Sequence, residues 1–360
     1  MLFRSHVWRV DMISAAGHAA QSSEPASHGR SRAVGSTNIR TVSTQEGEVL
    51  AVSHFNSSSG SIATFGTQQG IIHSWDLRCA NEPFKLQYSP ELGYMTSMAL
   101  GSDRNWIVSG TSRGYIALWD IRFQQCVKLW RHNRRVPISR LATSTVPMPE
   151  SWGTNVYGNN VRPFLFVAGG VNECSMFDVL SSTCTQCFRT VDGDKRNLNA
   201  HVDDPPKLID ISFNSKGTGF LKATKLQHDT DFIPLLSSIN CMVGSIGSNS
   251  SSYLITGGSD CSIRYWDFTT PSKCFVINGQ NQIQSRPTYE RIDFEGQRHL
   301  MLCRQSQQQA FRDETKLPRR NFHGLTKPEQ NHSDSILDIK LLENNGIVSC
   351  SSDGTIKFWK

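Results

Sequence analysis

The sequence of 360 residues contains no long hydrophobic run, since no stretch approaches the roughly 18 consecutive apolar residues of a membrane-spanning helix. The N-terminal stretch from Met1 to His6 is not followed by the unbroken apolar region of a signal peptide. The ten cysteines are too few and too irregularly spaced for a small disulfide framework, and several lie in apolar segments. These absences favour a reducing compartment, and we expect a cytoplasmic chain.

Strong charge and catalytic motifs are also missing. The net charge of +6 permits attraction to phosphate-rich surfaces but falls well short of a nucleic-acid-binding signature. The sequence has neither a P-loop nor the lysine and catalytic-loop signatures of a protein kinase. We therefore predict no enzymatic activity, no cofactor, no metal site, no nucleic-acid partner and no small-molecule substrate for this chain.

What the sequence does contain is an internal repeat. Five segments share a pair of small residues, a polar turn and alternating residues that lead to an aromatic side chain. They are Gly66–Arg78, Gly110–Arg122, Gly169–Val179, Gly257–Phe268 and Cys350–Lys360. Their aromatic residues are Trp75, Trp119, Phe177, Trp266 and Trp359.

Each repeat has the pattern of a β-hairpin. The central turns hold glycine or short polar residues, such as Asp353-Gly354, that accept a positive φ. The strand that follows alternates between two faces, as Ile356 and Phe358 do in the last repeat. One or two apolar strands precede each turn and another follows the aromatic residue, which gives four strands per repeat. The predicted fold is therefore all-β, a β-propeller with about five recognisable four-stranded blades.

Polar residues recur at fixed distances from the tryptophan. A hydroxyl lies ten residues before it at Ser109, Thr256 and Ser349, and an aspartate six residues before it at Asp260 and Asp353. In the last repeat, His332 lies in the loop that enters the first strand. This pattern resembles the His–Ser/Thr–Asp–Trp hydrogen-bond network of WD40 repeats. The alternative is a Ser–His–Asp catalytic triad, but we favour the structural network because its spacing recurs in other blades.

The spacing of the repeats predicts long insertions. The aromatic positions lie 44, 58, 89 and 93 residues apart, whereas a WD repeat has a period of about 40–45 residues. We assign residues 1–45 to the remnant of an upstream blade and a flexible segment, and residues 46–360 to the propeller. Residues 192–233 and 279–330 lack clear apolar periodicity and are expected to be insertions that form surface loops or disorder. The WD-repeat proteins that these repeats resemble usually form a closed ring of seven blades, whereas five are recognisable here. The resemblance therefore implies that the chain is the C-terminal part of a longer protein.

The arrangement resembles the C-terminal WD domain of the regulatory subunit of class III phosphatidylinositol 3-kinase. The residues that carry this resemblance are His54–Ser57, Gly110–Gly114, Trp119–Gln124, Gly170, Asn172, Glu173, Gly258–Asp260, Ile263–Asp267 and Ile356–Lys360. The resemblance extends from Glu46 to Lys360. It implies a scaffold for the lipid kinase catalytic subunit and a Beclin-type coiled-coil subunit in autophagy and in endosomal and vacuolar sorting. It also implies peripheral association with endosomal and autophagic membranes through the complex.

Arginines in two kinds of motif suggest contacts with partners. The sequence Trp-Asp-x-Arg occurs twice, ending at Arg78 and Arg122, and resembles the substrate receptors of cullin-4-type ubiquitin ligases. That family supplies the alternative function, and an Asp–Arg pair within the blade is the structural alternative. The cluster with Arg131, Arg134 and Arg135 is either a solvated loop or a contact for anionic lipid head groups or an acidic partner.

Two further motifs suggest chemistry but lack the required context. Gly110–Gly114 matches the G-x-S-x-G nucleophile elbow, which needs a strand-to-helix turn, whereas here another strand follows. Cys184 and Cys187 form a C-x-x-C without a second pair at zinc spacing. An enzyme built around the central channel would need carboxylates or histidines clustered at the strand starts, and the sequence shows no such cluster.

Overall fold

The computed structural model describes residues 3–7, 38–56, 61–77, 82–132, 135–147, 161–170, 172–192, 208–209, 211–213, 220–223, 238–245, 252–277, 287–294, 298–305, 331–342 and 346–359. These residues form β-strands and three short 3-10 helices, Thr44–Glu46 (η1), Pro90–Leu92 (η2) and Pro271–Lys273 (η4). None of the helices in this described part has the length and apolarity needed to cross a membrane.

Five sheets follow one another along the chain, and the consecutive antiparallel strands within each sheet form a blade. Blade 1 consists of β3 (Val49–Asn56), β4 (Ser61–Thr67), β5 (Ile71–Asp76) and β6 (Lys85–Tyr88). Blade 2 consists of β7 (Met95–Leu100), β8 (Trp106–Thr111), β9 (Tyr115–Asp120) and β10 (Gln125–Arg131). Blade 3 consists of β11 (Ile138–Pro147), β12 (Val161–Gly169), β13 (Glu173–Asp178) and β14 (Cys184–Asp192). Blade 4 consists of β17 (Ile239–Ser245), β18 (Tyr253–Gly258), β19 (Ile263–Asp267) and β20 (Phe275–Ile277). Blade 5 consists of β23 (Ile336–Leu341), β24 (Ile347–Ser351) and β25 (Ile356–Trp359).

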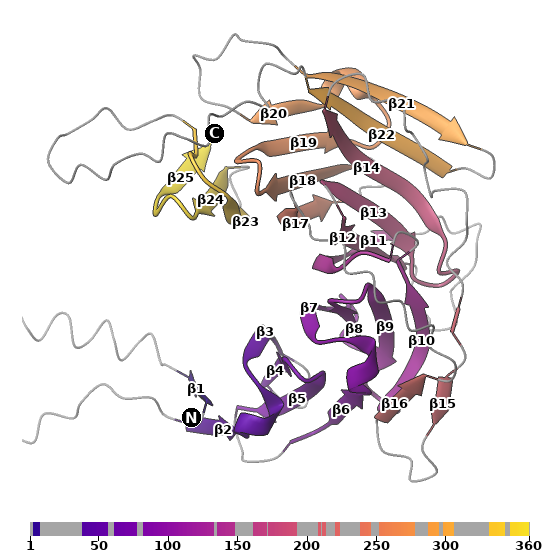
Figure 1. The fold of residues 1–360 in the computed structure, drawn as a ribbon, viewed down its shortest axis with the longest axis vertical. Coiled ribbons are helices and arrows are strands. Elements are labelled where there is room, and N and C mark those ends of the chain that lie inside the picture. Colours follow the sequence, from indigo (N-terminus) through magenta and orange to yellow (C-terminus); the bar gives the residue numbers. More distant parts are fainter. Residues whose placement is uncertain are drawn as a thin grey trace, which may run out of the picture.

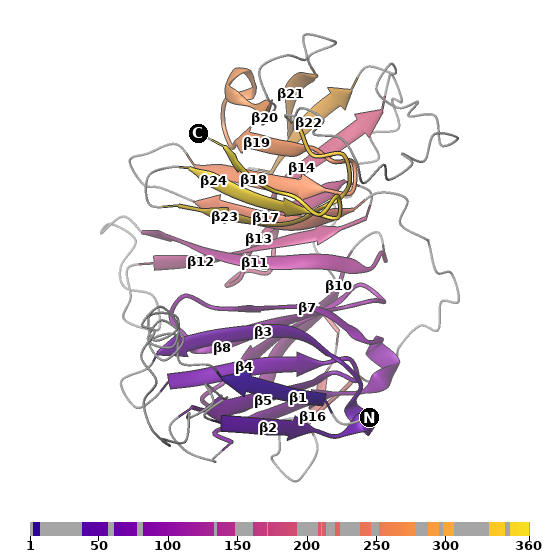
Figure 2. The same ribbon diagram turned by 90° about the vertical axis from the view of Figure 1, so that its left-hand side faces the viewer.

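The blades stand side by side in an open arc, with blade 1 and blade 5 at its two ends (Figures 1 and 2). The first strand of each blade lies next to the first strand of the following blade, so that β3, β7, β11, β17 and β23 are neighbours in that order. The prediction of an all-β propeller with five blades is confirmed. Blade 5 has three strands among the described residues, whereas blades 1 to 4 have four.

The aromatic residue on the third strand of a blade packs against the preceding blade. Trp119 lies fully buried in a cluster that joins blade 2 to Leu86 and Tyr88 of blade 1. Trp266 packs in the same way against Phe166 and Phe188 of blade 3. The alternation of the strands explains this arrangement, because the opposite face of each sheet contacts the blade that follows. Blades 2, 3 and 4 therefore each depend on both of their neighbours.

The second insertion does not form a loop throughout, which corrects one expectation. Within residues 279–330, β21 (Thr288–Phe294) and β22 (Arg298–Gln305) form an antiparallel hairpin, and β22 pairs in parallel with β14 at the outer edge of blade 3. Four consecutive residues, Leu300 to Cys303, are fully buried. A strand buried on both faces shows a continuous apolar run and not an alternating one, so a search for alternation misses it.

The first insertion also returns to earlier blades. Within residues 192–233, β15 (Ile211–Phe213) pairs with β16 (Phe220–Ala223), and β16 pairs in parallel with β6 of blade 1. Just before them, the amide of Ile209 donates to the carbonyl oxygen of Leu129 on β10 at 2.8 Å. This insertion therefore runs along the outer edges of blades 2 and 1. The remaining strands, β1 (Phe3–Val7) and β2 (Asn38–Val42), form a two-stranded sheet.

The first insertion contributes to the core between blades 1 and 2, so we expect it to stabilise the fold. Leu221 on β16 is 1% exposed and belongs to that core, whereas Leu208 of the same insertion is 59% exposed. We expect Leu221→Ala to lower the free energy of unfolding by about 2–5 kcal/mol because it leaves a cavity. Leu208→Ala is the matched control and should change it by less than about 0.5 kcal/mol. Equal unfolding midpoints of the two variants in urea would contradict a structural role for this segment.

Candidate functional site: blade networks and arginine surfaces

The predicted polar residues of blade 5 meet in one hydrogen-bond network around the buried His332 and Ser349. Nε2 of His332 lies 2.7 Å from Oγ of Ser349, and Nδ1 lies 3.1 Å from Oδ2 of Asp353. Trp359 donates its indole N–H to the same Ser349 Oγ at 2.8 Å. The network links the loop before β23, the second strand and the third strand, and thereby fixes the entry of the chain into the blade.

Hydrogen bonds govern the charge of the aspartate in this network. Burial alone would raise the pKa of Asp353, but bonds from the Thr355 hydroxyl, from the backbone amides of Ser333 and Thr355 and from His332 outweigh it. The pKa of Asp353 is therefore held well below its usual range. The carboxylate stays ionised at neutral pH and accepts these bonds.

The geometry of Ser349, His332 and Asp353 does not suit catalysis. Ser349 is completely buried, and its oxygen accepts the hydrogen bond from Trp359 on one side while it contacts His332 on the other. A serine nucleophile needs an exposed oxygen that a substrate can reach. The same indole-to-hydroxyl bond occurs in blade 4, from Trp266 to Thr256, and in blade 2, from Trp119 to Ser109. The residues thus join strands in several blades.

The blades differ in what completes the network. In blade 4, Asp260 forms an ion pair with Arg264, two residues before the tryptophan, with 2.6 Å between the charged atoms. In blade 1, Trp75 is buried, and the equivalent position holds His73, whose two ring nitrogens lie 2.6 Å from Glu46 and from Glu82.

In blade 5 the residue two before the tryptophan is Lys357, and its ammonium group donates to the carbonyl oxygen of Asn331. In blades 1 and 5 this side chain binds the loop that enters the first strand. Sequence reasoning missed these contacts, although a polar side chain recurring two residues before the tryptophan was the available signal.

The arginines of the Trp-Asp-x-Arg boxes lie in different situations. Arg122 binds Asp120 of its own blade, with Nη2 2.6 Å from Oδ2 and Nε 3.1 Å from Oδ1. Burial would raise the pKa of Asp120, but the bonds from Arg122 outweigh it and lower that pKa. The structure thus shows at Arg122 the Asp–Arg pair within the blade, which was the alternative to a contact with a partner. Arg78, the arginine of the other box, lies outside the described residues.

The basic cluster after blade 2 divides into exposed and buried residues. Arg131 is half-buried at the end of β10, with its guanidinium 4.9 Å from the ring centre of Tyr115. Arg135 is exposed, and Arg134 lies outside the described residues. His132, between them in sequence, is buried, and its amide donates to the carbonyl oxygen of Gly114. It therefore belongs to the blade interior and not to the basic surface.

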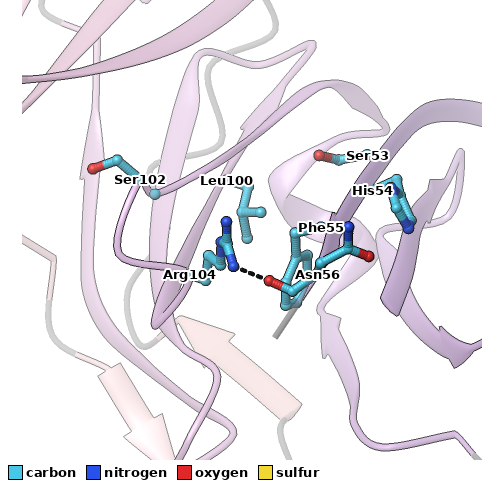
Figure 3. A pocket seen from close by; sticks show the side chains of 8 residues that line it. Ser53, His54, Phe55, Asn56, Leu100, Ser102 and Arg104 are labelled. Atoms are coloured by element: carbon cyan, nitrogen blue, oxygen red, sulfur yellow. Dashed lines mark hydrogen bonds between the residues drawn. The ribbon is translucent and has the colours of Figure 1, made fainter. Parts of the chain in front are cut away.

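The other candidate sites show no catalytic arrangement. A groove of about 470 Å³ between the ends of β3 and β7 is lined by Ser53 to Asn56, Leu100 to Ser102 and Arg104. Figure 3 shows Arg104 directed at the carbonyl oxygen of Asn56, so its charged group is held by the backbone. The one histidine that lines the groove, His54, has its Nε2 at 2.7 Å from Oγ of Ser61, and the lining residues include no carboxylate.

The C-x-x-C pair lies inside blade 3. Both Cys184 and Cys187 are buried free thiols on β14. Burial raises the pKa of Cys184 to about 12. Because a metal binds the thiolate form, this environment favours a role in packing. Within the described ranges, no cluster of histidine, cysteine and acidic residues is arranged to hold a metal ion.

Comparison with known proteins identifies the repeats. The family described as "WD domain, G-beta repeat" matches residues 235–267 and 326–360, which include strands of blades 4 and 5. The family described as "Nucleolar protein 10-like, N-terminal domain" matches residues 36–151, which cover blades 1 and 2. The chain therefore carries WD40 repeats.

Among curated proteins, the chain is similar to serine/threonine-protein kinase VPS15 of Arabidopsis thaliana, with 25% identity over 91% of this chain and 22% of that protein. The probable serine/threonine-protein kinase vps15 of Dictyostelium discoideum is 41% identical over 24% of this chain and 5% of that protein. The chain is thus homologous to VPS15 and spans about a fifth of the length of the Arabidopsis relative, given its 22% coverage.

A chain in the crystal structure of the mitotic checkpoint complex superposes with a TM-score of 0.46 at 14% sequence identity. It covers 89% of this chain and 64% of the other.

The serines of blades 5 and 2 take part in different numbers of hydrogen bonds, which predicts different losses of stability when each is replaced by alanine. Ser349→Ala removes a partner from both His332 and Trp359, and each buried polar group left unsatisfied costs about 1–3 kcal/mol. Ser109→Ala is the matched control because it removes only the 3.2 Å bond from Trp119. We expect the larger fall in thermal unfolding midpoint for Ser349→Ala. A fall of the same size in both variants would mean that the contact between His332 and Ser349 does not contribute to stability.

The lowered pKa of Asp353 predicts a pH dependence of stability. A carboxylate whose pKa is lower in the folded state stabilises the fold above its unfolded pKa of about 4, and this contribution is lost as the pH falls below that value. At neutral pH we expect Asp353→Asn to unfold at a lower urea concentration than the parent chain. The difference between their midpoints should shrink on acidification below about pH 4. A difference that stayed constant from neutral to acidic pH would contradict the proposed ionic role.

Proposed function

We propose that this VPS15 homologue is a non-catalytic scaffold, the WD-repeat part of a regulatory subunit in a class III phosphatidylinositol 3-kinase complex. The observation that carries the proposal is its homology to VPS15 over 91% of the chain, combined with the resemblance of its repeats to that subunit. The buried state of Ser349 and His332 supports a structural role for the blade networks. Surfaces of the blades and their loops are then left for contacts with other proteins.

The partners we propose are the lipid kinase catalytic subunit and a Beclin-type coiled-coil subunit. Through them the chain associates peripherally with endosomal and autophagic membranes, on their cytoplasmic side, and acts in autophagy and vacuolar sorting. The half-buried Arg131 and the exposed Arg135 are candidate contacts for these partners or for the membrane. Arg78 and Arg134 are proposed with them from the sequence alone, whereas Arg122 binds Asp120 and is retained only for the ubiquitin-ligase alternative.

The arc is proposed to be part of a ring of about seven blades. Exposed apolar side chains on the faces turned toward the opening of the arc support this proposal. Val52 of β3 is 70% exposed, and Ile356 and Phe358 of β25 are 75% and 54% exposed. Such faces are normally covered by a neighbouring blade.

Affinity purification of the tagged protein from its native cells tests this function. We expect mass spectrometry to recover a class III lipid kinase catalytic subunit and a Beclin-type subunit. Arg122→Ala should leave this recovery unchanged, because Arg122 is bound to Asp120 within its own blade. Recovery of a cullin-4 adaptor that is lost in Arg122→Ala, without lipid kinase subunits, would support the ubiquitin-ligase alternative and contradict the scaffold proposal.

A further inference from the structure

One end of blade 2 gathers arginines around an exposed tyrosine. Tyr94, between η2 and β7, is 50% exposed. Arg113 lies in the turn between β8 and β9, and Arg131 and Arg135 lie at the end of β10 and in the loop after it. Arg113 and Arg135 are exposed, and Arg131 is half-buried. We call these four residues the arginine–tyrosine patch.

The three loops that carry the patch pack directly against one another. The amide of Ser112 donates to the carbonyl oxygen of Tyr94 at 2.9 Å, and the amide of His132 donates to that of Gly114 at 2.8 Å. Gly114 has a φ of 79°, and a Cβ there would lie 2.5 Å from the carbonyl oxygen of Val136. Because only glycine permits this close approach, the loops hold a defined arrangement.

Backbone carbonyl groups orient the arginine side chains. Nε of Arg131 donates to the carbonyl oxygen of Arg113 at 3.0 Å, while the guanidinium stacks over Tyr115. Nη1 of Arg113 donates to the carbonyl oxygen of Glu91 at 2.8 Å. A guanidinium has five N–H donors, so this bond uses one of those of Arg113. A bond to a carbonyl oxygen also leaves the positive charge in place, unlike the bond between Arg122 and Asp120.

We propose that the arginine–tyrosine patch binds an extended acidic segment of a protein partner. Carboxylates of the segment bind the guanidinium groups of Arg113 and Arg135, and an apolar side chain of the segment packs on the ring of Tyr94. The inference deepens the proposed scaffold function and rests on it, since it assigns a partner chemistry to one surface of the scaffold.

An acidic peptide fits the patch better than an anionic membrane does. The planar guanidinium group matches the planar carboxylate, which it can bind with two parallel hydrogen bonds, and that of Arg113 is already oriented by the carbonyl oxygen of Glu91. Glu91 is exposed, and its backbone carbonyl oxygen accepts the bond from Arg113, so an acidic residue adjoins the patch and would repel a continuous anionic lipid surface. A peptide can place its acidic residues at the arginines and keep them away from Glu91.

Fluorescence anisotropy with the purified chain and a fluorescein-labelled polyglutamate peptide carrying one central phenylalanine tests the proposal. We expect Arg113→Glu and Arg135→Glu each to weaken binding about tenfold. Tyr94→Ala should weaken it about threefold through lost ring contact. The matched control is Arg104→Glu, which changes the net charge equally. Arg104 is exposed at the opposite end of blade 2, because β8 runs between it and Arg113.

The outcomes separate this proposal from its alternatives and from the scaffold function. Thermal unfolding midpoints equal to that of the parent show that a variant is folded, and Arg113→Glu and Arg135→Glu give two independent measurements. Equal loss of binding in Arg104→Glu would overturn the proposal, because it would show attraction by net charge alone. No binding of the peptide by the parent chain would also overturn it.

Binding of phosphatidylserine vesicles that is lost in Arg113→Glu, in the absence of peptide binding, would instead identify a membrane contact. These measurements use the isolated chain, so failure here leaves the recovery of lipid kinase subunits unaffected. Failure of that recovery would in turn remove the scaffold function without changing the peptide affinity.

Discussion

The structure depends on the need of each sheet to cover both of its faces. A single four-stranded sheet is too small to bury its apolar side chains alone, and stacking against neighbours solves this problem. The third-strand aromatic residue faces the preceding blade, as Trp119 and Trp266 do, and the other face of the sheet contacts the next blade. The inner strands therefore follow one another in chain order, and the arc in Figure 1 follows from this packing.

Polar networks are most complete where packing is weakest. Trp119 of blade 2 is fully buried and donates one hydrogen bond, to Ser109, whereas Trp359 is half-buried in blade 5, which has three strands among the described residues. Blade 5 adds His332 and Asp353 to its network. In blade 5, hydrogen bonds therefore hold the entering loop, the second strand and the third strand together. In blade 2, apolar contacts with the neighbouring blades serve this purpose.

The sequence was sufficient to predict the five repeats, their hairpins and the spacing of their hydroxyl and tryptophan residues, because these depend on local turn chemistry and on period-two alternation. Strands β16 and β22 could not be predicted in this way. Each is added in parallel to the outer edge of a blade far away along the chain, and such pairing has no turn signal. The continuous apolar run at Leu300 to Cys303 was the one local indication. Ion pairs such as Asp260 with Arg264 also depend on which side chains meet in space.

The bonding partner of each arginine determines how its charge acts at the surface. Arg122 binds the carboxylate of Asp120, so the pair presents little net charge to an approaching molecule. Arg113 binds a carbonyl oxygen, which orients the guanidinium and preserves its charge. The repeated Trp-Asp-x-Arg pattern is conspicuous in the sequence, yet the arginine of its second copy, Arg122, contributes to the blade. The arginine in the neighbouring turn has no motif, and it is the one with the charge and orientation to bind a partner.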